Sequence, residues 1–294
     1  MKPGKGVDPF GIDWVVTSAG AMPDTRVPPK FTEIEEWRDY VHFPNLDDVD
    51  FKGTAEVEMN GIDRSEKLVF YYSACGVFER LAAYMGFADA LVAIAENPDE
   101  CRAFYEAFTD YKIAVAERIV DAYDIDVYYN FDDVATAKGL FISPDTYREV
   151  IKPCHARLAK AITDMGVIFG EHTCGKCEEI VPDYVDFGAK IWTSAQIMND
   201  ISGLQERFKG QLVIEGCWNS SGRPGFIDAT EEEVRAETRR CLSEYGSKGG
   251  YILRPVIFNE RGNSVIVGDD RLKAVADEWM KYRDLEKLKA GILA

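Results

Sequence analysis

Short apolar or β-branched runs alternate with longer segments of helical period along most of the chain. The runs predict buried strands, at Lys67–Tyr72, Asp126–Phe131, Val167–Gly170, Lys190–Thr193, Gln211–Gly216 and Tyr251–Leu253. The segments between and after them predict helices, at Val77–Glu96, Pro98–Tyr123, Pro144–Met165, Lys176–Phe187, Asn199–Phe208, Glu231–Tyr245 and Asp269–Lys289. Strands that alternate with helices in this way pair in parallel, because each helix carries the chain back across the sheet.

Two further observations favour a closed barrel over an open doubly wound sheet. No Gly-x-Gly-x-x-Gly motif follows the early strands, which disfavours a dinucleotide-binding sheet. The strand–helix units also recur regularly over residues 61–294, and 294 residues is an ordinary length for one barrel. We therefore predict a single α/β structure, a (β/α)8 TIM-type barrel.

The first 60 residues lack this regularity. They contain several prolines, many acidic residues and scattered aromatic residues, with one short helix expected near Thr32–Tyr40. This pattern predicts an irregular N-terminal arm or lid that packs on the barrel. A solvated arm and a functional lid are both consistent with it.

Charge and composition exclude several classes of protein. Lysine and arginine number 34 and aspartate and glutamate 51, so the formal charge of −17 repels nucleic acid and anionic membrane surfaces. No apolar run has the length of a signal peptide or a membrane span, so we expect a cytoplasmic protein. In that reducing compartment the seven cysteines are expected as thiols or metal ligands. The sequence leaves open whether the chain forms a homo-oligomer.

Polar side chains that can bind metals or substrates follow five of the predicted strands. In a parallel barrel the C-terminal ends of the strands meet at one rim, which carries the functional residues. These positions are Asp132 and Asp133; Glu171, His172 and Cys174; Gln196, Asn199 and Asp200; Glu215, Cys217, Trp218 and Asn219; and Arg254. Neighbouring residues of a strand face opposite ways, so only one of Asp132 and Asp133 should point inward, and the sequence does not decide which.

The stretch "FGEHTCGKCEEI" holds one of the three histidines and two of the seven cysteines. His172 and Cys174 are two residues apart at a strand end, so they point the same way, and imidazole and thiolate are ligands that zinc prefers. Cys217 at the end of a later strand, or Cys177 nearby, supplies a third ligand. The pair Cys174 and Cys177 also resembles a dithiol redox motif. The alternative without function is a buried turn in which these thiols pack.

Several stretches resemble one family in their order along the chain. They are "DPFGIDW", "GVFERLAAYMGFADALVAIAENPDE", "DVYYNFDDVATAKGLFISPDTYREVIKPCHARLAKAITDMG", "EHTCG" and "EEEVRAETRRCLSEYGSKGGYIL". They resemble the uroporphyrinogen decarboxylase-like superfamily, in particular its branch of corrinoid-dependent methyltransferases from anaerobes. The resemblance covers most of the chain and implies a (β/α)8 barrel. In that branch a His-x-Cys pair and one distal cysteine hold zinc, and His172 and Cys174 match the pair.

The chain departs from that pattern at two places. Where thiol-methylating members carry the distal cysteine, after a late "GGYIL"-like strand, this chain reads "RPVI" from Arg254 onward. The third ligand is therefore expected to be Cys217, with Cys177 as the alternative. Members also carry a further segment before "DPFGIDW", so a barrel shortened at its N-terminus is expected. The arginine-rich N-terminal signature of the decarboxylase is absent, which disfavours porphyrinogen decarboxylation.

The resemblance implies a zinc-dependent methyltransferase component of anaerobic methyl metabolism. It would activate a methylated small molecule, of methyl ether or amine type because the late cysteine is absent, for transfer to a corrinoid (cobalamin) carried by a partner protein. The expected zinc ligands are His172, Cys174 and Cys217. The expected proton-transfer residues are Asp132, Asp133 and Glu171, and the expected substrate-binding residues are Asn130, Gln196 and Asn199. The alternatives are a metal-free decarboxylase or lyase, and a non-catalytic barrel subunit.

Overall fold

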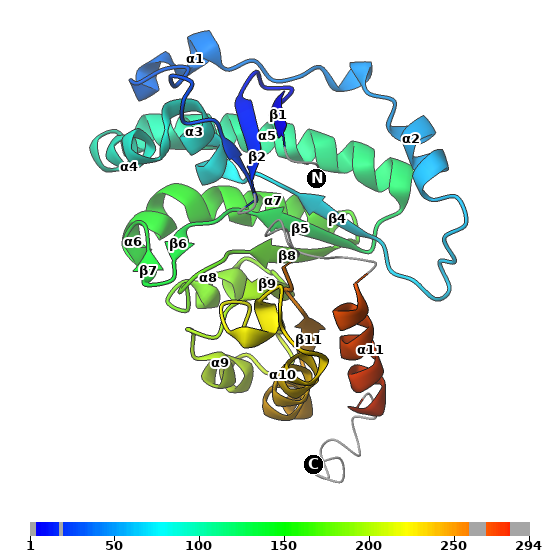
Figure 1. Ribbon diagram of the computed structural model, residues 1–294. Helices are drawn as coiled ribbons and strands as arrows, with labels where there is room; N and C mark the ends of the chain where they lie inside the picture. Colours follow the sequence, from blue (N-terminus) through cyan, green and yellow to red (C-terminus); the bar gives the residue numbers. More distant parts are fainter. Residues whose placement is uncertain (1–3, 18–19, 259–268, 283–294) are drawn as a thin grey trace.

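The computed structural model describes residues 4–17, 20–258 and 269–282. A parallel sheet of six strands runs through its centre, in the order β11-β10-β9-β8-β5-β4 (Figure 1). The strands are β4 (Phe70–Ser73), β5 (Val127–Phe131), β8 (Ile168–His172), β9 (Ile191–Ala195), β10 (Val213–Cys217) and β11 (Tyr251–Arg254). All six predicted strands and their parallel pairing are therefore confirmed.

Helices cover the outer face of this sheet and connect its strands (Figure 1). Asn97 caps the start of the long helix α5, and Asp124, in a left-handed conformation (φ +50°), ends it. The helix therefore has the bounds predicted for it, Pro98–Tyr123. The predicted helix Val77–Glu96 is two helices, because Gly86 at φ +89° interrupts it. The predicted helix Asp269–Lys289 is described only as far as its residue 282. The helices are α3 (Val77–Met85), α4 (Phe87–Glu96), α5 (Pro98–Tyr123), α6 (Pro144–Thr146), the π-helical turn Tyr147–Ile151, α7 (Lys152–Asp164), α8 (Val181–Asp186), α9 (Ile201–Arg207), α10 (Glu231–Glu244) and α11 (Asp270–Tyr282).

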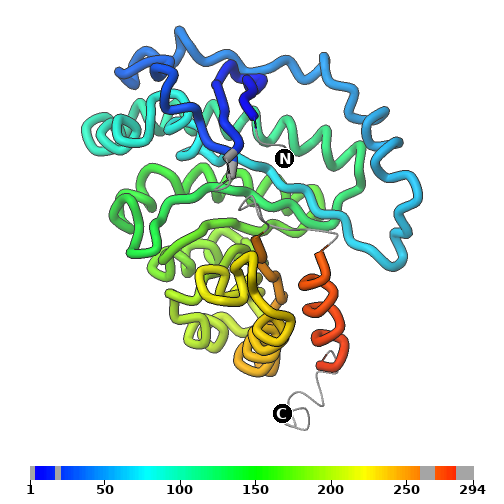
Figure 2. Tube along the Cα trace, viewed as in Figure 1, coloured from blue at the N-terminus to red at the C-terminus, as the bar shows by residue number. Residues whose placement is uncertain are grey.

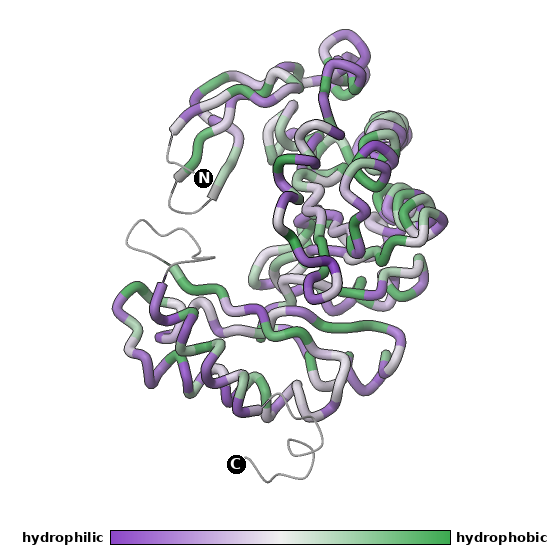
Figure 3. Tube along the Cα trace, turned by 90° about the vertical axis from the view of Figure 1, so that its right-hand side faces the viewer, coloured by the Kyte–Doolittle hydropathy of each residue, from purple (hydrophilic) through white to green (hydrophobic). Residues whose placement is uncertain are grey.

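The sheet curves enough that side chains from distant strands meet in its interior. Tyr129 on β5 donates a 2.6 Å hydrogen bond to Glu215 on β10, although β8 and β9 lie between these strands. Arg254 at the end of β11 lies 5.7 Å from the ring centroid of Tyr72 on β4, so the two edge strands of the described sheet approach across the interior. A small apolar cluster that includes Tyr129 lies inside the curve. Figure 3 shows how hydrophobic and hydrophilic stretches alternate along the chain. The fold belongs to the predicted barrel class, and six of the strands among the described residues form its parallel sheet; β6 (Ala135–Thr136) and β7 (Gly139–Leu140) form a separate hairpin.

The N-terminal segment contains regular structure that the sequence did not predict. The carboxylate of Asp8 accepts hydrogen bonds from the backbone N–H groups of Phe10 and Ile12 and from the indole N–H of Trp14. Arg80 on α3 pairs with the same carboxylate at 2.6 Å and is itself buried. The stretch "DPFGIDW" is therefore an anchor on α3 rather than part of an irregular arm. It belongs to an antiparallel three-stranded meander, made of β1 (Gly4–Val7), β2 (Asp13–Thr17) and β3 (Gly20–Pro23).

From β3 to β4 the chain follows the outside of α5 (Figure 1, Figure 2). The Trp37 indole donates to Glu100 at the start of α5, and Tyr123 at its end donates to Glu58. The helix predicted near Thr32–Tyr40 is confirmed in its second half, whereas α2 was not predicted. The elements of this segment are α1 (Trp37–Tyr40), α2 (Phe51–Glu58) and the 3-10 turns Ile34–Glu36 and Leu46–Asp48; two further 3-10 turns are Arg223–Gly225 and Gly246–Lys248. Over the described residues, no helix has the length and apolar character needed to cross a membrane.

The interior of the barrel leaves no room for a side chain at Gly170 on β8. A Cβ atom at this position would lie 2.5 Å from the ring of Tyr129. We expect Gly170→Ala to lower the free energy of unfolding by about 1–3 kcal/mol, because the ring that bonds Glu215 must move. Urea denaturation followed by circular dichroism measures this. Gly6→Ala is the matched control, since nothing lies within 4 Å of its Cβ position, and equal losses in the two variants would contradict the explanation.

Candidate metal and substrate site

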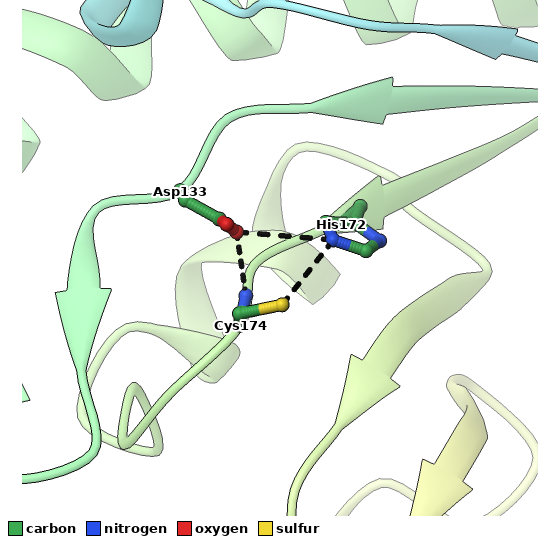
Figure 4. Close-up of side chains that lie close together, drawn as sticks. All are labelled: Asp133, His172 and Cys174. Carbon is green, nitrogen blue, oxygen red and sulfur yellow. Dashed lines mark hydrogen bonds and ion pairs between the residues drawn. The ribbon is translucent and has the colours of Figure 1, made fainter. Parts of the chain in front are cut away.

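Three side chains that can bind a metal converge where β5 and β8 end (Figure 4). Asp133 lies in the loop after β5, His172 is the last residue of β8, and Cys174 follows two residues later. Nε2 of His172 lies 3.5 Å from Sγ of Cys174 and 3.8 Å from Oδ1 of Asp133. The ligand atoms of this rim group (Asp133, His172 and Cys174) all lie within 4.8 Å of one another. Within the described part of the chain, no other set of three His, Cys, Asp or Glu side chains is as closely placed.

Hydrogen bonds hold the loop that carries Cys174. The backbone N–H of Cys174 donates to Oδ1 of Asp133 at 2.7 Å, and the backbone N–H of Gly175 donates to the side-chain oxygen of Gln196 at 3.2 Å. The Asn199 amide accepts from two further backbone N–H groups of the loop and donates to the carbonyl of Gly175 at 2.9 Å. Gln196 and Asn199 were predicted to bind substrate through their side-chain amides. In the structure these amides form hydrogen bonds with the backbone of the loop.

Burial governs the protonation of the rim group. It lowers the pKa of His172 to about 3, with a smaller contribution from the charge of Arg254, so the imidazole is neutral at pH 7. Burial raises the pKa of Cys174 to about 12, and the negative charge of Asp133 adds to this, so the thiol keeps its proton in the absence of a cation. Burial also raises the pKa of Asp133. Neutral imidazole is the form that binds metals.

Stacking, together with the contact of Nε2 with Sγ of Cys174, orients the imidazole of His172. The ring of Phe131 lies 3.8 Å from it, centroid to centroid, at an interplanar angle of 15°. Nδ1 of His172 is buried and has no hydrogen-bond partner among the described residues, whereas metal-binding histidines generally donate through their second nitrogen. The ring of Phe131 thus helps to fix the orientation of the imidazole on the side where Nδ1 has no partner.

The two adjacent aspartates have separate roles. Asp132 is fully buried and accepts hydrogen bonds from the backbone N–H groups of Phe78 (3.2 Å) and Glu79 (3.1 Å) at the start of α3. Its carboxylate also lies 2.9 Å from Nε2 of His155. Asp133 instead belongs to the rim group. The structure therefore answers the question that the sequence left open: Asp132 holds α3, and Asp133 faces the site.

Glu171 and Asn130 lie on the face of the sheet that packs against the helices. Both are buried, and the Asn130 amide donates to the Glu171 carboxylate at 3.0 Å. His155 on α7 lies 3.6 Å from the same carboxylate. Burial raises the pKa of Glu171 to about 7, which the neighbouring His155 opposes. Neither residue borders the rim group, so this placement gives no support to their predicted roles in proton transfer and substrate binding.

The structure does not bring Cys217 to the rim group. Cys217 ends β10 in a left-handed conformation (φ +60°) and is fully buried. Its carbonyl oxygen accepts a 2.9 Å hydrogen bond from Arg240 on α10, and Sγ of Cys241 lies 3.5 Å from the same oxygen. Asp133, rather than the expected Cys217, is thus the third side chain that the structure places beside His172 and Cys174. Cys177 is also fully buried outside the group, in the turn before α8 rather than in a first helical turn.

Several residues near the rim group had no specific role assigned to them from the sequence. Ser194, in a left-handed conformation (φ +62°), places its hydroxyl 3.1 Å from Sγ of Cys174. Inside the barrel, Arg254 donates to the Thr193 hydroxyl at 2.8 Å and to Glu215 at 3.3 Å. Glu215 lies near the end of one predicted strand and Arg254 directly follows another, and this position at a strand end is why both were named among the expected rim residues.

A cavity of about 640 Å³ lies beside the rim group, between the N-terminal meander and the barrel. Asp133 borders it, and so does Phe131, which stacks on the histidine of the group. Cys75 and Glu79 at the start of α3 line it as well. Burial raises the pKa of Cys75 to about 12, and burial together with the charge of Asp132 raises that of Glu79 to about 8. A volume of this size is typical of pockets for organic ligands.

Comparison with known proteins places the chain in a family. The family model described as "Uroporphyrinogen decarboxylase (URO-D)" matches residues 69–255, which is more than half of the chain. The chain belongs to the uroporphyrinogen decarboxylase family. The matched span contains all six strands of the parallel sheet and all three residues of the rim group. The predicted family is confirmed.

A curated relative and a solved structure that are similar to this URO-D family chain are both methyltransferases. A methylated-thiol–coenzyme M methyltransferase of Methanosarcina mazei is 28% identical over 155 residues, which cover 50% of this chain and 37% of that protein. The chain thus spans little more than a third of the length of that relative. A solved structure of a methyltransferase from Methanosarcina mazei superposes with a TM-score of 0.67 at 15% identity, covering 94% of this chain and 77% of the other. This likeness supports the barrel class.

Proposed function

We propose that this URO-D family protein is a methyltransferase component that activates a methylated small molecule for transfer to a corrinoid carried by a partner protein. The observation that carries the proposal is the rim group, which places a nitrogen, a sulfur and an oxygen donor within 4.8 Å of one another at the edge of an organic-ligand cavity. The methyltransferase relatives support the same class of reaction. All seven cysteines are free thiols, in keeping with a reducing cytoplasm.

The rim group fits a divalent cation such as Zn²⁺. Zinc in proteins takes imidazole nitrogen, thiolate sulfur and carboxylate oxygen, and catalytic sites use three protein ligands with one position left for another molecule. Nε2 of His172 belongs to a neutral imidazole and turns toward the other two donors. We infer that Asp133, His172 and Cys174 hold the cation. A zinc ion in such a site supplies Lewis-acid polarisation of the substrate heteroatom.

The residues around the rim group would position the substrate and keep water away. The cavity holds the organic part of the substrate next to Asp133, while Phe131 keeps the imidazole of His172 in its orientation. In the overall reaction the bond from the substrate heteroatom to its methyl carbon breaks and a bond from that carbon to cobalt forms. The heteroatom would leave with the electron pair of the broken bond and take up one proton where the donor is an ether, an alcohol or an uncharged amine, whereas a quaternary ammonium donor would leave as a neutral amine. A reduced corrinoid on the partner would supply the electron pair of the new bond. This balance requires no further oxidant or reductant.

Methyl transfer to free cob(I)alamin tests the proposal. The purified chain, with and without zinc, is mixed under anaerobic conditions with methoxybenzene, tetramethylammonium or methanol. Loss of the cob(I)alamin absorbance would report methylation of cobalt. We expect zinc-dependent methylation with at least one donor. Methylation that is equally fast after chelation would contradict the metal part of the proposal, and carbon dioxide release from a carboxylated substrate would favour the lyase alternative.

Metal binding is expected to release protons from the rim group. The cation binds thiolate, so Cys174, whose pKa of about 12 keeps it protonated, must lose about one proton on binding at pH 8. His172 contributes none, because its pKa of about 3 leaves it neutral already. Calorimetric titration of zinc in buffers of different ionisation enthalpy measures the number released. At zinc concentrations that saturate the wild type, Cys174→Ala should show almost no zinc-linked proton release, and a release equal to that of the wild type would contradict the assignment of this thiol as a ligand.

A further inference from the structure

A second cavity, of about 380 Å³, lies at the end of the sheet opposite the rim group. Its lining includes Lys190, which directly precedes β9, residues 210–212 before β10, and Gly249 and Gly250 before β11. The rim group instead lies where β5 and β8 end. Catalytic residues of barrels of this class gather at the C-terminal ends of the strands. A ligand in this second cavity would therefore be distinct from the substrate of the rim group.

The charged side chains of the described lining are all basic. Lys190, Lys209 and Lys248 line the second cavity, which we call the lysine cavity, and all three are exposed. No aspartate or glutamate is among its described lining residues, whereas the cavity beside Asp133 is bordered by several carboxyl groups. The chain as a whole carries a formal charge of −17. Three ammonium groups without a carboxylate thus oppose the overall charge of the protein and attract an anion.

These three lysines also lack ion-pair partners among the described residues. Most lysine and arginine side chains in the described part of the chain are paired with a carboxylate. The exposed side chains for which no such pair exists there are Lys67, Lys138, Lys190, Arg207, Lys209 and Lys248. Three of these line the lysine cavity, and Arg207 ends α9 two residues before Lys209. The unpaired positive charges are therefore concentrated around this one cavity.

A buried amide adds a hydrogen-bond acceptor to the wall of the lysine cavity. Gln205 on α9 lines the cavity and is 7% exposed. Its amide nitrogen donates to the carbonyl oxygens of Tyr245 at 3.1 Å and Gly249 at 3.3 Å, which fixes the orientation of the amide. Its Oε1 atom is buried and has no hydrogen-bond partner among the described residues. Because a buried acceptor without a donor is costly, a hydroxyl or N–H group of a ligand would satisfy it.

The volume of the lysine cavity limits its ligand to a small molecule. Pockets for organic ligands measure about 300–1,000 Å³, and 380 Å³ lies near the lower end of that range. A long polyanion such as nucleic acid would also face the acidic remainder of the surface, which repels it. A ligand with a single negative charge would leave most of the positive charge of the wall without a partner. A small anion with several charges fits best.

We propose that the lysine cavity is a binding site for a small anion that carries two or more negative charges and a hydroxyl or N–H group, such as a phosphorylated or polycarboxylated hydroxy compound. The ammonium groups of Lys190, Lys209 and Lys248 bind the anionic groups, and Oε1 of Gln205 accepts the hydrogen bond. The ligand contacts segments that precede β9, β10 and β11, so its binding stabilises the folded chain. This inference depends neither on a metal ion nor on the reaction at the rim group.

Calorimetric titration at low ionic strength with two pairs of anions and acetate tests the inference. Citrate is paired with propane-1,2,3-tricarboxylate, and glycerol 3-phosphate with methyl phosphate. The first member of each pair has a hydroxyl group that the second lacks, and the pairs distinguish a carboxylate ligand from a phosphate ligand. In at least one pair we expect the hydroxyl-bearing member to bind at least about threefold tighter than its partner and about tenfold tighter than acetate. It should also raise the melting temperature.

Two results would overturn the inference. Acetate that binds as tightly as every multiply charged probe would show that the lysine cavity does not select for charge. Equal affinities within both pairs would show that Gln205 does not accept a hydrogen bond from the ligand. Failure of zinc binding would leave this inference untouched and would bear on the rim group alone.

A matched pair of variants locates the binding site. Lys209→Gln removes one ammonium group of the lysine cavity, and Lys138→Gln removes an equally exposed and unpaired one outside it, so neither change should prevent folding. Lys209→Gln should raise the dissociation constant of the tightest probe at least about threefold, and Lys138→Gln should leave it unchanged. Equal effects of the two substitutions would show nonspecific attraction to surface charge and would overturn the inference.

Discussion

Purified protein supplied with zinc is expected to hold about one metal ion per chain, and His172→Ala, Cys174→Ala and Asp133→Ala are each expected to hold almost none. Removing one of three protein ligands should weaken binding by more than about 100-fold, since even the loss of an outer partner of a ligand costs 10–100-fold. Elemental mass spectrometry after gel filtration measures the metal content. The three donor atoms lie within 4.8 Å of one another, so each is expected to contribute to binding of the same ion.

Cys217→Ala is the matched control for this experiment. Its side chain is buried against α10 and outside the rim group, so the variant should keep its metal if circular dichroism shows that it is folded. Loss of metal in folded Cys217→Ala, together with retention in Asp133→Ala, would restore the ligand set that the sequence suggested. Absence of metal from every protein, wild type included, would remove the basis of the proposed reaction.

Asp132→Ala is expected to lower the free energy of unfolding by about 3–5 kcal/mol, whereas Asp133→Ala should change it by less than about 1 kcal/mol. The first substitution leaves His155 buried without its partner and removes the acceptor of two backbone N–H groups at the start of α3. The second removes a carboxyl group whose pKa burial already raises, so little stabilisation is lost. Urea denaturation of the metal-free proteins measures both values.

Metal content should rank the two variants in the opposite order to stability. It therefore separates the role of Asp132 in folding from the role of Asp133 in the rim group. At a urea concentration where both variants are folded, Asp132→Ala should retain measurable affinity for zinc, and Asp133→Ala should not. Two variants that lose stability and metal to the same extent would show that the adjacent aspartates act as one unit, contrary to the geometry. An Asp132→Asn variant, which keeps one acceptor oxygen, should fall between wild type and Asp132→Ala in stability.

The sheet was readable from the sequence because each strand is a short buried run bounded by helical segments. The six runs could be placed in one parallel sheet, since no tight turn joins any two of them. The N-terminal meander was not readable in this way. Its strands are short and largely exposed, and its stability depends on the distant Arg80, whose pairing with Asp8 no local pattern reveals.

The part of the site that could be predicted is the part that depends only on which way side chains point from one strand. His172 and Cys174 are two residues apart, which places both on one face whatever the rest of the fold does. Cys217 also ends a strand, but its left-handed backbone and the neighbouring α10 turn it out of reach of the other two. For Asp132 and Asp133 the alternation showed that their roles differ, and only the position of α3 decided which residue had which.

One peptide bond joins Asp132, which holds the start of α3, to Asp133, which faces the rim group. Phe78, whose backbone N–H bonds to Asp132, also lines the cavity. A ligand that moves the start of α3 therefore moves the peptide that carries Asp133. Thermodynamic linkage then requires reciprocity: the factor by which cavity occupancy changes the affinity for a cation equals the factor by which the cation changes the affinity for the ligand. Each affinity has a defined value only when the occupancy of the other site is stated.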